Sequence, residues 1–186
     1  MKSGKSGYFP TIRINRHGGF RRAVAAVFTL ACMMMVPPVL LAEEPELADR
    51  VVISKVERKL YLYRGDEILR DMDIALGLVP VGNKEAEGDF RTPEGSYQLT
   101  ERNPASDYFL SIKISYPSEQ DERTARSRGI DPGGQIMIHG QPNEPSHSDA
   151  YYQWTDWTEG CVALSNADMV DVWLMTLPNT PIQILP

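Results

Sequence analysis

A histidine and a cysteine in the C-terminal half of the chain are the residues best suited to chemistry. His139 follows the apolar run 136–138, and Cys161 lies 22 positions later, directly after Gly160. In such pairs a thiolate attacks an acyl carbon, while an imidazole takes the thiol proton and later returns it to a leaving amine. The pair therefore predicts nucleophilic acyl transfer, with Cys161 as the nucleophile and His139 as the general base and acid.

Acyl transfer also requires hydrogen-bond donors for the developing oxyanion and a group that orients the imidazole. A glycine directly before a nucleophile lets a substrate carbonyl approach the backbone closely. We therefore expect the backbone N–H groups of Gly160 and Cys161 to be the oxyanion donors. The spacing of His139 and Cys161 does not by itself bring them together, so the surrounding elements must do so.

The first 42 residues predict export. They contain six Lys and Arg and no acid, and an apolar stretch at 23–41 ends at the small residue Ala42. Basic, apolar and small-residue regions in this order are typical of a secretory signal peptide. The uninterrupted apolar part, 23–36, is shorter than the roughly 20 residues of a spanning helix, which favours cleavage over retention as a membrane anchor. We expect a protein of the periplasm or cell envelope that meets the membrane only through this signal or the uncleaved anchor.

Export strengthens the assignment of Cys161. The other cysteine, Cys32, lies within the predicted signal peptide, so Cys161 becomes the sole thiol. A leftover cysteine in an oxidising compartment forms an intermolecular bridge or is a reactive thiol, and a buried inert cysteine is the alternative. The polar neighbours Thr158 and Glu159 favour a reactive thiol.

The charge of the chain argues against a nucleic-acid partner. The whole chain carries a formal charge of −6, and its first 42 residues contribute six positive charges, so the remainder carries −12. Binding to a phosphate backbone requires a basic surface. We expect no nucleic acid to bind.

The 144 residues after the predicted signal are enough for one domain. Residues 43–50 form an acidic lead-in, and residues 51–186 are the predicted catalytic domain. A helix is expected within 118–128 and another from a cap at Ser165. Apolar alternation and turn residues predict strands at 51–53, 60–63, 68–76, 96–100, 110–114, 135–138 and 182–184. The expected fold is therefore mostly β with one or two short helices, an α+β class.

Two loops flank the predicted site. Residues 77–95 are rich in Gly and Pro and contain Arg91, whose guanidinium matches a substrate carboxylate, although a plain strand connection is the simpler interpretation. Residues 141–157 form a long polar and aromatic loop, and loops of this length are often lids or binding loops. Its rings contact substrate or pack the loop against the body. The candidate contacts here are Tyr152, Trp154, Trp157 and the following Thr158.

Three motifs together resemble a known family over about residues 50–185. His139-Gly140, then Thr158-x-Gly160-Cys161-Val162, preceded by Gly88-Asp89-x-x-Thr92-Pro93-x-Gly95, are similar to the YkuD-type L,D-transpeptidase catalytic domain. The resemblance implies a mixed β-sandwich-like fold with a long loop over the site. It implies that the cysteine attacks a peptidoglycan stem peptide, that the backbone carbonyl of Gly140 orients the imidazole, and that neither metal nor cofactor takes part.

The resemblance further implies a thioester acyl-enzyme that passes to an amine, giving a 3-3 cross-link or the attachment of a lipoprotein. Two positions depart from the family pattern: Glu159 replaces a common His, and Ala163 replaces a common Arg. An added anion and a missing cation both raise the pKa of a thiol. These departures resemble the YafK-type murein-editing branch. Resolution by water, as an L,D-carboxypeptidase or by release of a peptidoglycan-linked lipoprotein, is therefore the alternative outcome.

Other classes of protein fit the residues less well. Papain-like and NlpC-type hydrolases place Cys before His, and sortases need a later arginine, whereas no Arg or Lys follows Cys161. A zinc site made by His139, His147 and Cys161 lacks a recognisable ligand spacing. A non-catalytic peptidoglycan-binding domain with a relic site stays open, because Glu159 and Ala163 leave room for it.

Overall fold

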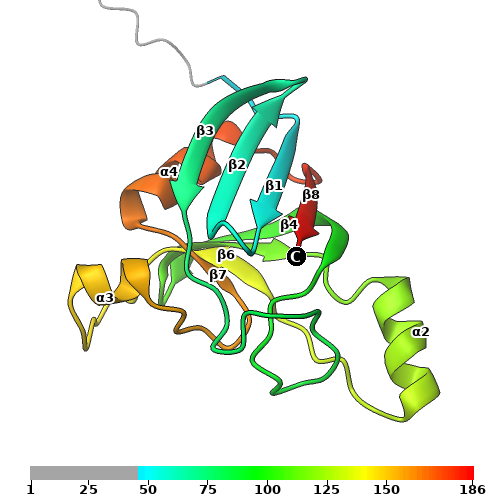
Figure 1. The fold of residues 1–186 in the computed structure, drawn as a ribbon. Helices are drawn as coiled ribbons and strands as arrows, with labels where there is room; N and C mark the ends of the chain where they lie inside the picture. The colour runs from blue at the N-terminus through cyan, green and yellow to red at the C-terminus, as the bar shows by residue number, and fades with distance from the viewer. Residues whose placement is uncertain (1–45) are drawn as a thin grey trace, which may run out of the picture. The chain divides into compact units, whose positions relative to one another are not determined.

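A computed structural model describes residues 46–186, so the signal peptide expected at 1–42 lies outside the described residues. The described part forms eight strands and three helices (Figure 1). Their bounds are β1 Arg50–Ser54, β2 Lys59–Arg64, β3 Glu67–Asp73, β4 Gly95–Ser106, β5 Phe109–Ile114, α2 Glu119–Arg128, β6 Met137–His139, α3 Asp149–Trp154, β7 Val162–Ala163, α4 Asn166–Met175 and β8 Pro181–Leu185.

All eight strands belong to one mixed sheet in the order β3-β2-β1-β8-β4-β5-β6-β7. The 12-residue strand β4 joins its two halves, because its first residues pair with β8 and its later residues pair with β5. The pairs β1–β8 and β6–β7 are parallel, and the other pairs are antiparallel. Figure 1 shows β1, β2, β3 and β8 standing above β4, β6 and β7, which run across below them in this view.

Alternating side chains build the core between these elements. In β2, Leu60 and Leu62 are fully buried while the intervening Tyr61 and the following Tyr63 are partly exposed, as expected for a sheet with one face inward. Helix α4 begins at the cap Ser165, whose hydroxyl accepts the Asp168 N–H. It buries Met169, Val172 and Met175, and these join the same cluster as the strands.

The predicted fold class is confirmed, with two additions. Strand β4 continues six residues beyond the predicted 96–100, to Ser106, and α3 is a third short helix inside the loop predicted at 141–157. Ala48, within the predicted acidic lead-in, is buried in the core and donates its N–H to the Met175 carbonyl oxygen at 2.7 Å. None of the helices within residues 46–186 has the length and apolar character needed to cross a membrane.

Candidate active site

The parallel pairing of β6 with β7 places the segments of His139 and Cys161 side by side. The register pairs His139 with Ala163 and Ile138 with Val162, and Cys161 directly precedes β7. The Met137 N–H donates to Cys161 Sγ at 3.4 Å, which holds the sulfur beside β6, two residues before the histidine.

The His139 imidazole is buried and fixed in one tautomer. Its Nδ1 lies 2.7 Å from the carbonyl oxygen of Gly140, and a carbonyl only accepts, so Nδ1 carries the proton and Nε2 keeps a free lone pair. The rings of Tyr108 and Trp157 pack on it, with centroids 4.7 and 5.6 Å away. Burial lowers the pKa of His139 to about 4 despite the opposing effect of the Gly140 carbonyl. The imidazole is therefore a neutral base at physiological pH.

The Cys161 thiol is free and partly exposed. Burial of the sulfur is the largest influence and raises the pKa of the thiol. The Met137 N–H and the positive charge of Lys84 act in the opposite direction, and the negative charge of Glu159 adds to the rise. The sulfur is also within 3.6 Å of the Gln135 carbonyl oxygen, to which its S–H donates. At neutral pH the two groups are therefore a thiol and a neutral imidazole.

A tight turn at 158–161 presents the cysteine. The buried hydroxyl of Thr158 donates to the Cys161 carbonyl oxygen at 2.7 Å and accepts the Gly160 N–H at 3.1 Å. The Gly160 N–H therefore has an internal partner in this structure, and its role as an oxyanion donor stays a prediction. Among residues 158–161, the N–H groups of Thr158 and Gly160 have hydrogen-bond partners within the described part of the chain, whereas those of Glu159 and Cys161 have none.

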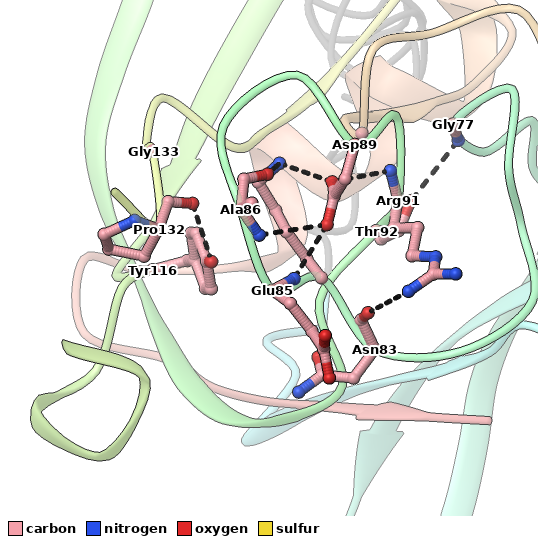
Figure 2. A network of polar contacts seen from close by, with 12 residues as sticks. Gly77, Asn83, Glu85, Ala86, Asp89, Arg91, Thr92, Tyr116, Pro132 and Gly133 are labelled. Carbon is pink, nitrogen blue, oxygen red and sulfur yellow. Dashed lines mark hydrogen bonds and ion pairs between the residues drawn. The ribbon is translucent and has the colours of Figure 1, made fainter. Parts of the chain in front are cut away.

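The loop between β3 and β4 packs its backbone directly against this turn, and Asp89 holds the loop together (Figure 2). Its carboxylate accepts the N–H groups of Glu85, Ala86 and Arg91 and pairs with the buried Lys84 ammonium at 2.9 Å. Burial alone would raise the pKa of Asp89, but these hydrogen bonds lower it to about 2. Gly160 packs against the backbone of this loop, since a Cβ there would be 2.6 Å from the Arg91 carbonyl oxygen.

The predicted substrate contacts divide into two groups. Tyr152 and Trp157 line a cavity of about 670 Å³ beside His139, and the Trp157 indole donates to the Tyr152 carbonyl oxygen at 3.0 Å. Trp154 is 69% exposed and borders a different hollow, next to Arg58 and Asp156, so it lies apart from the histidine. Thr158 is buried within the turn.

The backbone of Arg91 packs against Gly160, whereas its side chain points toward Asn83. Its side chain extends toward Asn83, whose carbonyl oxygen is 3.5 Å from one terminal nitrogen (Figure 2). The Nε atom is buried and has no hydrogen-bond partner among residues 46–186. A carboxylate contact by Arg91 remains a prediction.

Reasoning from sequence missed three residues of this site. Tyr108 packs on the imidazole, Lys84 is the cation that acts on the thiol, and Asp89 orders the loop. The motif containing Asp89 was recognised as a turn, which was the available signal for its role. Across residues 46–186, no three His, Cys, Asp or Glu side chains gather closely enough to hold a metal ion. His147 stacks on Tyr151 instead, with ring centroids 4.1 Å apart.

The sequence was compared with known protein families, and one family matches. Residues 48–184 match the YkuD family, described as the L,D-transpeptidase catalytic domain. The chain belongs to this family. The resemblance inferred from the His-Gly and Gly-Cys motifs is thereby confirmed.

Individual relatives agree with the family. A protein of Escherichia coli (strain K12) that is named as an L,D-transpeptidase, YafK, is 35% identical to this chain over 96 residues. The match covers 48% of this chain and 37% of YafK. The crystal structure of the helical cell shape determining protein Pgp2 from Campylobacter jejuni has a TM-score of 0.55 and 26% identity, covering 77% of this chain and 51% of that one.

Bd1075 from Bdellovibrio bacteriovorus shares the fold, with a TM-score of 0.51 and 22% identity over 77% of this chain and 52% of that one. This chain therefore spans about half the length of these structural relatives and a smaller part of YafK.

Proposed function

We propose that residues 51–186 are a cysteine acyltransferase domain that acts on peptidoglycan stem peptides through a thioester at Cys161. The observation that carries the proposal is the fixed tautomer of His139, whose Nδ1 donates to the Gly140 carbonyl oxygen, while the Met137 N–H of the same strand donates to the Cys161 sulfur. This leaves Nε2 as a base for the thiol. Membership of the L,D-transpeptidase catalytic domain family supports a peptide of the cell wall as the substrate.

The first half-reaction forms the thioester. Nε2 of His139 takes the thiol proton as Sγ of Cys161 bonds to the carbonyl carbon between the third residue of the stem and the terminal D-residue. The Cys161 N–H stabilises the oxyanion. The carbon–nitrogen bond then breaks, and the imidazolium returns its proton to the leaving amine, which departs as a free D-amino acid.

The second half-reaction decides the outcome. An amine that attacks the thioester gives a 3-3 cross-link or attaches a protein, and water gives hydrolysis or releases a peptidoglycan-linked lipoprotein. Transfer to an amine is the function that we propose. Glu159 and Ala163, at the positions of the family's usual His and Arg, favour the alternative in which water attacks the thioester.

The substrate lies outside the cytoplasmic membrane, so the proposal includes export through a signal at 1–42 and a location in the periplasm or cell envelope. The basic and then apolar sequence of this segment supports it. A peptidoglycan-linked lipoprotein is the proposed second partner.

The test is a mass measurement on the purified protein after incubation with a tetrapeptide stem donor. We expect the mass to increase by the acyl tripeptide on Cys161, and we expect Cys161→Ala and His139→Ala to abolish turnover while circular dichroism stays unchanged. Glu101→Ala, which changes an exposed residue of β4, is the control and should keep full activity. Full activity of Cys161→Ala on muropeptides would refute the mechanism. If deleting the gene altered neither the muropeptides nor the lipoprotein linkage, the domain would instead be a non-catalytic relic.

A further inference from the structure

The cavity beside His139 has a wall that the acylation step does not use. Its lining includes the carboxylates of Asp107 and Glu144 and the rings of Tyr108, Tyr152 and Trp157. Two of these rings, Tyr108 and Trp157, are the ones packed on the imidazole. The cavity therefore opens next to the base and holds about 670 Å³, enough for a side chain or a short peptide.

Asn143 fixes the acidic side of this cavity. Its backbone N–H donates to the Asp107 carbonyl oxygen at 2.9 Å, its side-chain oxygen accepts the Phe109 N–H at 3.0 Å, and its amide nitrogen donates to the Ser106 carbonyl oxygen at 2.9 Å. These three bonds join the β4–β5 turn to the loop after β6. Glu144, the next residue, and Asp107 both line the cavity and are both exposed.

The opposite side is equally ordered. The Tyr152 hydroxyl accepts the Ser146 N–H at 3.0 Å, and the Trp157 indole is bound to the Tyr152 backbone. The rings of Tyr152 and Trp157 meet edge to face, with centroids 5.1 Å apart. The aromatic wall is thus preformed.

The charges of the wall favour one kind of ligand. Within residues 46–186, neither Asp107 nor Glu144 forms an ion pair, and no Lys or Arg lines the cavity. Two unpaired carboxylates beside aromatic faces attract a cation by charge and by the ring quadrupoles.

We propose that this cavity binds the amine partner of the reaction as an alkylammonium group, with Asp107 and Glu144 as its anionic contacts and Tyr108 and Trp157 as its aromatic contacts. The inference rests on the proposed function and deepens it, because it names the amine side of the reaction. A second stem peptide and the lysine side chain of a protein both carry this group. The same pocket receives the attacking amine in transfer and the departing amine in release.

The transfer step balances as follows. The bound ammonium gives one proton to bulk water and becomes a neutral amine. Its lone pair forms the new carbon–nitrogen bond to the thioester carbon, the carbon–sulfur bond breaks, and Cys161 leaves as the thiolate. Nε2 of His139 takes the second proton from the attacking nitrogen and passes it to that thiolate, which restores the thiol. The products are an amide and the free enzyme.

Binding is tested without catalysis in full-length Cys161→Ala protein. The readout is the indole N–H resonance of Trp157, followed by nuclear magnetic resonance. The probes are Nα-acetyl-lysine amide, Nα-acetyl-norleucine amide as its uncharged counterpart, and diaminopimelate as the amine of a stem peptide. We expect the lysine probe to shift the resonance and the norleucine probe to leave it in place. A shift with diaminopimelate alone would assign the pocket to a stem peptide, and a shift with the lysine probe alone would assign it to a protein lysine.

Charge-removing variants test the two carboxylates. Asp107→Asn combined with Glu144→Gln should weaken binding of the charged probes about three- to tenfold, the range expected for exposed charge pairs. Asp66→Asn combined with Glu67→Gln, at the β2–β3 turn, removes the same charge elsewhere and should leave binding unchanged. Equal binding of the norleucine probe, unchanged binding in the first double variant, or an equal loss in the second would each overturn the proposal. The proposal would also be overturned if chitobiose, a sugar without an ammonium group, bound to the cavity and the ammonium probes did not.

A covalent adduct on Cys161 with no ammonium binding would reject this inference and leave the proposed function standing. Ammonium binding with no adduct would reject the proposed function.

Discussion

The hydroxyl of Thr158 forms hydrogen bonds to both the carbonyl oxygen of Cys161 and the N–H of Gly160, at 2.7 and 3.1 Å. One buried side chain thus sets the backbone conformation on either side of the nucleophile. The Gly160 amide is turned inward, and the Cys161 amide is left for substrate. We therefore predict that Thr158 acts on the proposed reaction by positioning the backbone of Cys161.

Thr158→Val tests this role, because it removes the hydroxyl and keeps the shape. We expect the free energy of unfolding to fall by about 1–3 kcal/mol, the cost of leaving a buried polar group unpaired. We also expect slower formation of the Cys161 adduct, measured by mass spectrometry, alongside denaturant unfolding. Thr158→Ser keeps the hydroxyl and should restore most of both. A Thr158→Val protein that acylates at the original rate would remove Thr158 from the site.

Two substitutions should move the pKa of the Cys161 thiol in opposite directions. Lys84 lowers this pKa and Glu159 raises it. Lys84→Met should therefore raise the pKa and slow alkylation at a given pH, whereas Glu159→Gln should lower the pKa and speed alkylation. The measurement is the rate of iodoacetamide alkylation against pH.

Lys84 also pairs with Asp89, so the controls must separate charge from folding. Lys84→Arg keeps the positive charge and should preserve the alkylation profile, and Lys59→Met removes a lysine from β2 and should not alter it. If Glu159→Gln leaves the thiol pKa unchanged, the anion has no influence on the nucleophile.

The strands that carry the pair could be read from sequence because local alternation sets them. The hairpin at Gly65, the strand ending at His139 and the helix beginning at Ser165 all follow from apolar periodicity, turn residues and a cap. The parallel pairing of β6 and β7 could not be read, since it joins segments more than 20 residues apart without any local pattern.

The missed parts of the site depend on long-range packing. Tyr108 reaches His139 only because Asn143 binds the β4–β5 turn to a later loop. Helix α3 has six residues and is held by its Ser148 cap and the burial of Tyr152, which is too short a segment for a periodic signal. The direction of the Thr158 hydroxyl, which accepts the Gly160 N–H, likewise depends on the folded turn.

The rate of Cys161 acylation should fall only at an unusually acid pH. Burial holds the pKa of His139 at about 4, so the imidazole remains an unprotonated base down to that region. We expect the rate of Cys161 acylation to be nearly constant from about pH 5 to 8 and to fall below about pH 4–5, instead of near the ordinary histidine value of about 6.5. A half-maximal rate near pH 6.5 would show that the base is exposed or is another group.

The low pKa of His139 also predicts that the free energy of unfolding depends on pH. In the unfolded chain, His139 binds a proton below about pH 6.5. In the folded chain, the same imidazole binds a proton only below about pH 4. The free energy of unfolding should therefore fall by about 3 kcal/mol as the pH decreases across this window. His139→Asn should abolish this contribution, measured by urea unfolding at several pH values. An unchanged slope in the variant would assign the effect to other groups.

Close contact between the turn and the β3–β4 loop should make Gly160 intolerant of any side chain. Gly160 has a φ of 126°, and a Cβ there would lie 2.6 Å from the Arg91 carbonyl oxygen. Gly160→Ala must therefore displace the backbone of the loop that Asp89 holds, in addition to the strain of a positive φ. Gly88 also has a positive φ, 74°, but a Cβ there meets nothing within 4 Å.

Gly88→Ala shows the cost of a positive φ where no steric contact is added. Gly88→Ala should cost about 1–2 kcal/mol of unfolding free energy, which is the penalty of the left-handed backbone alone. Gly160→Ala should cost more than this and should reduce adduct formation at Cys161 at least about tenfold, because the nucleophile and its amide move with the turn. Thermal unfolding and mass spectrometry measure the two effects. Equal losses in both variants would mean that the loop yields freely and does not position Cys161.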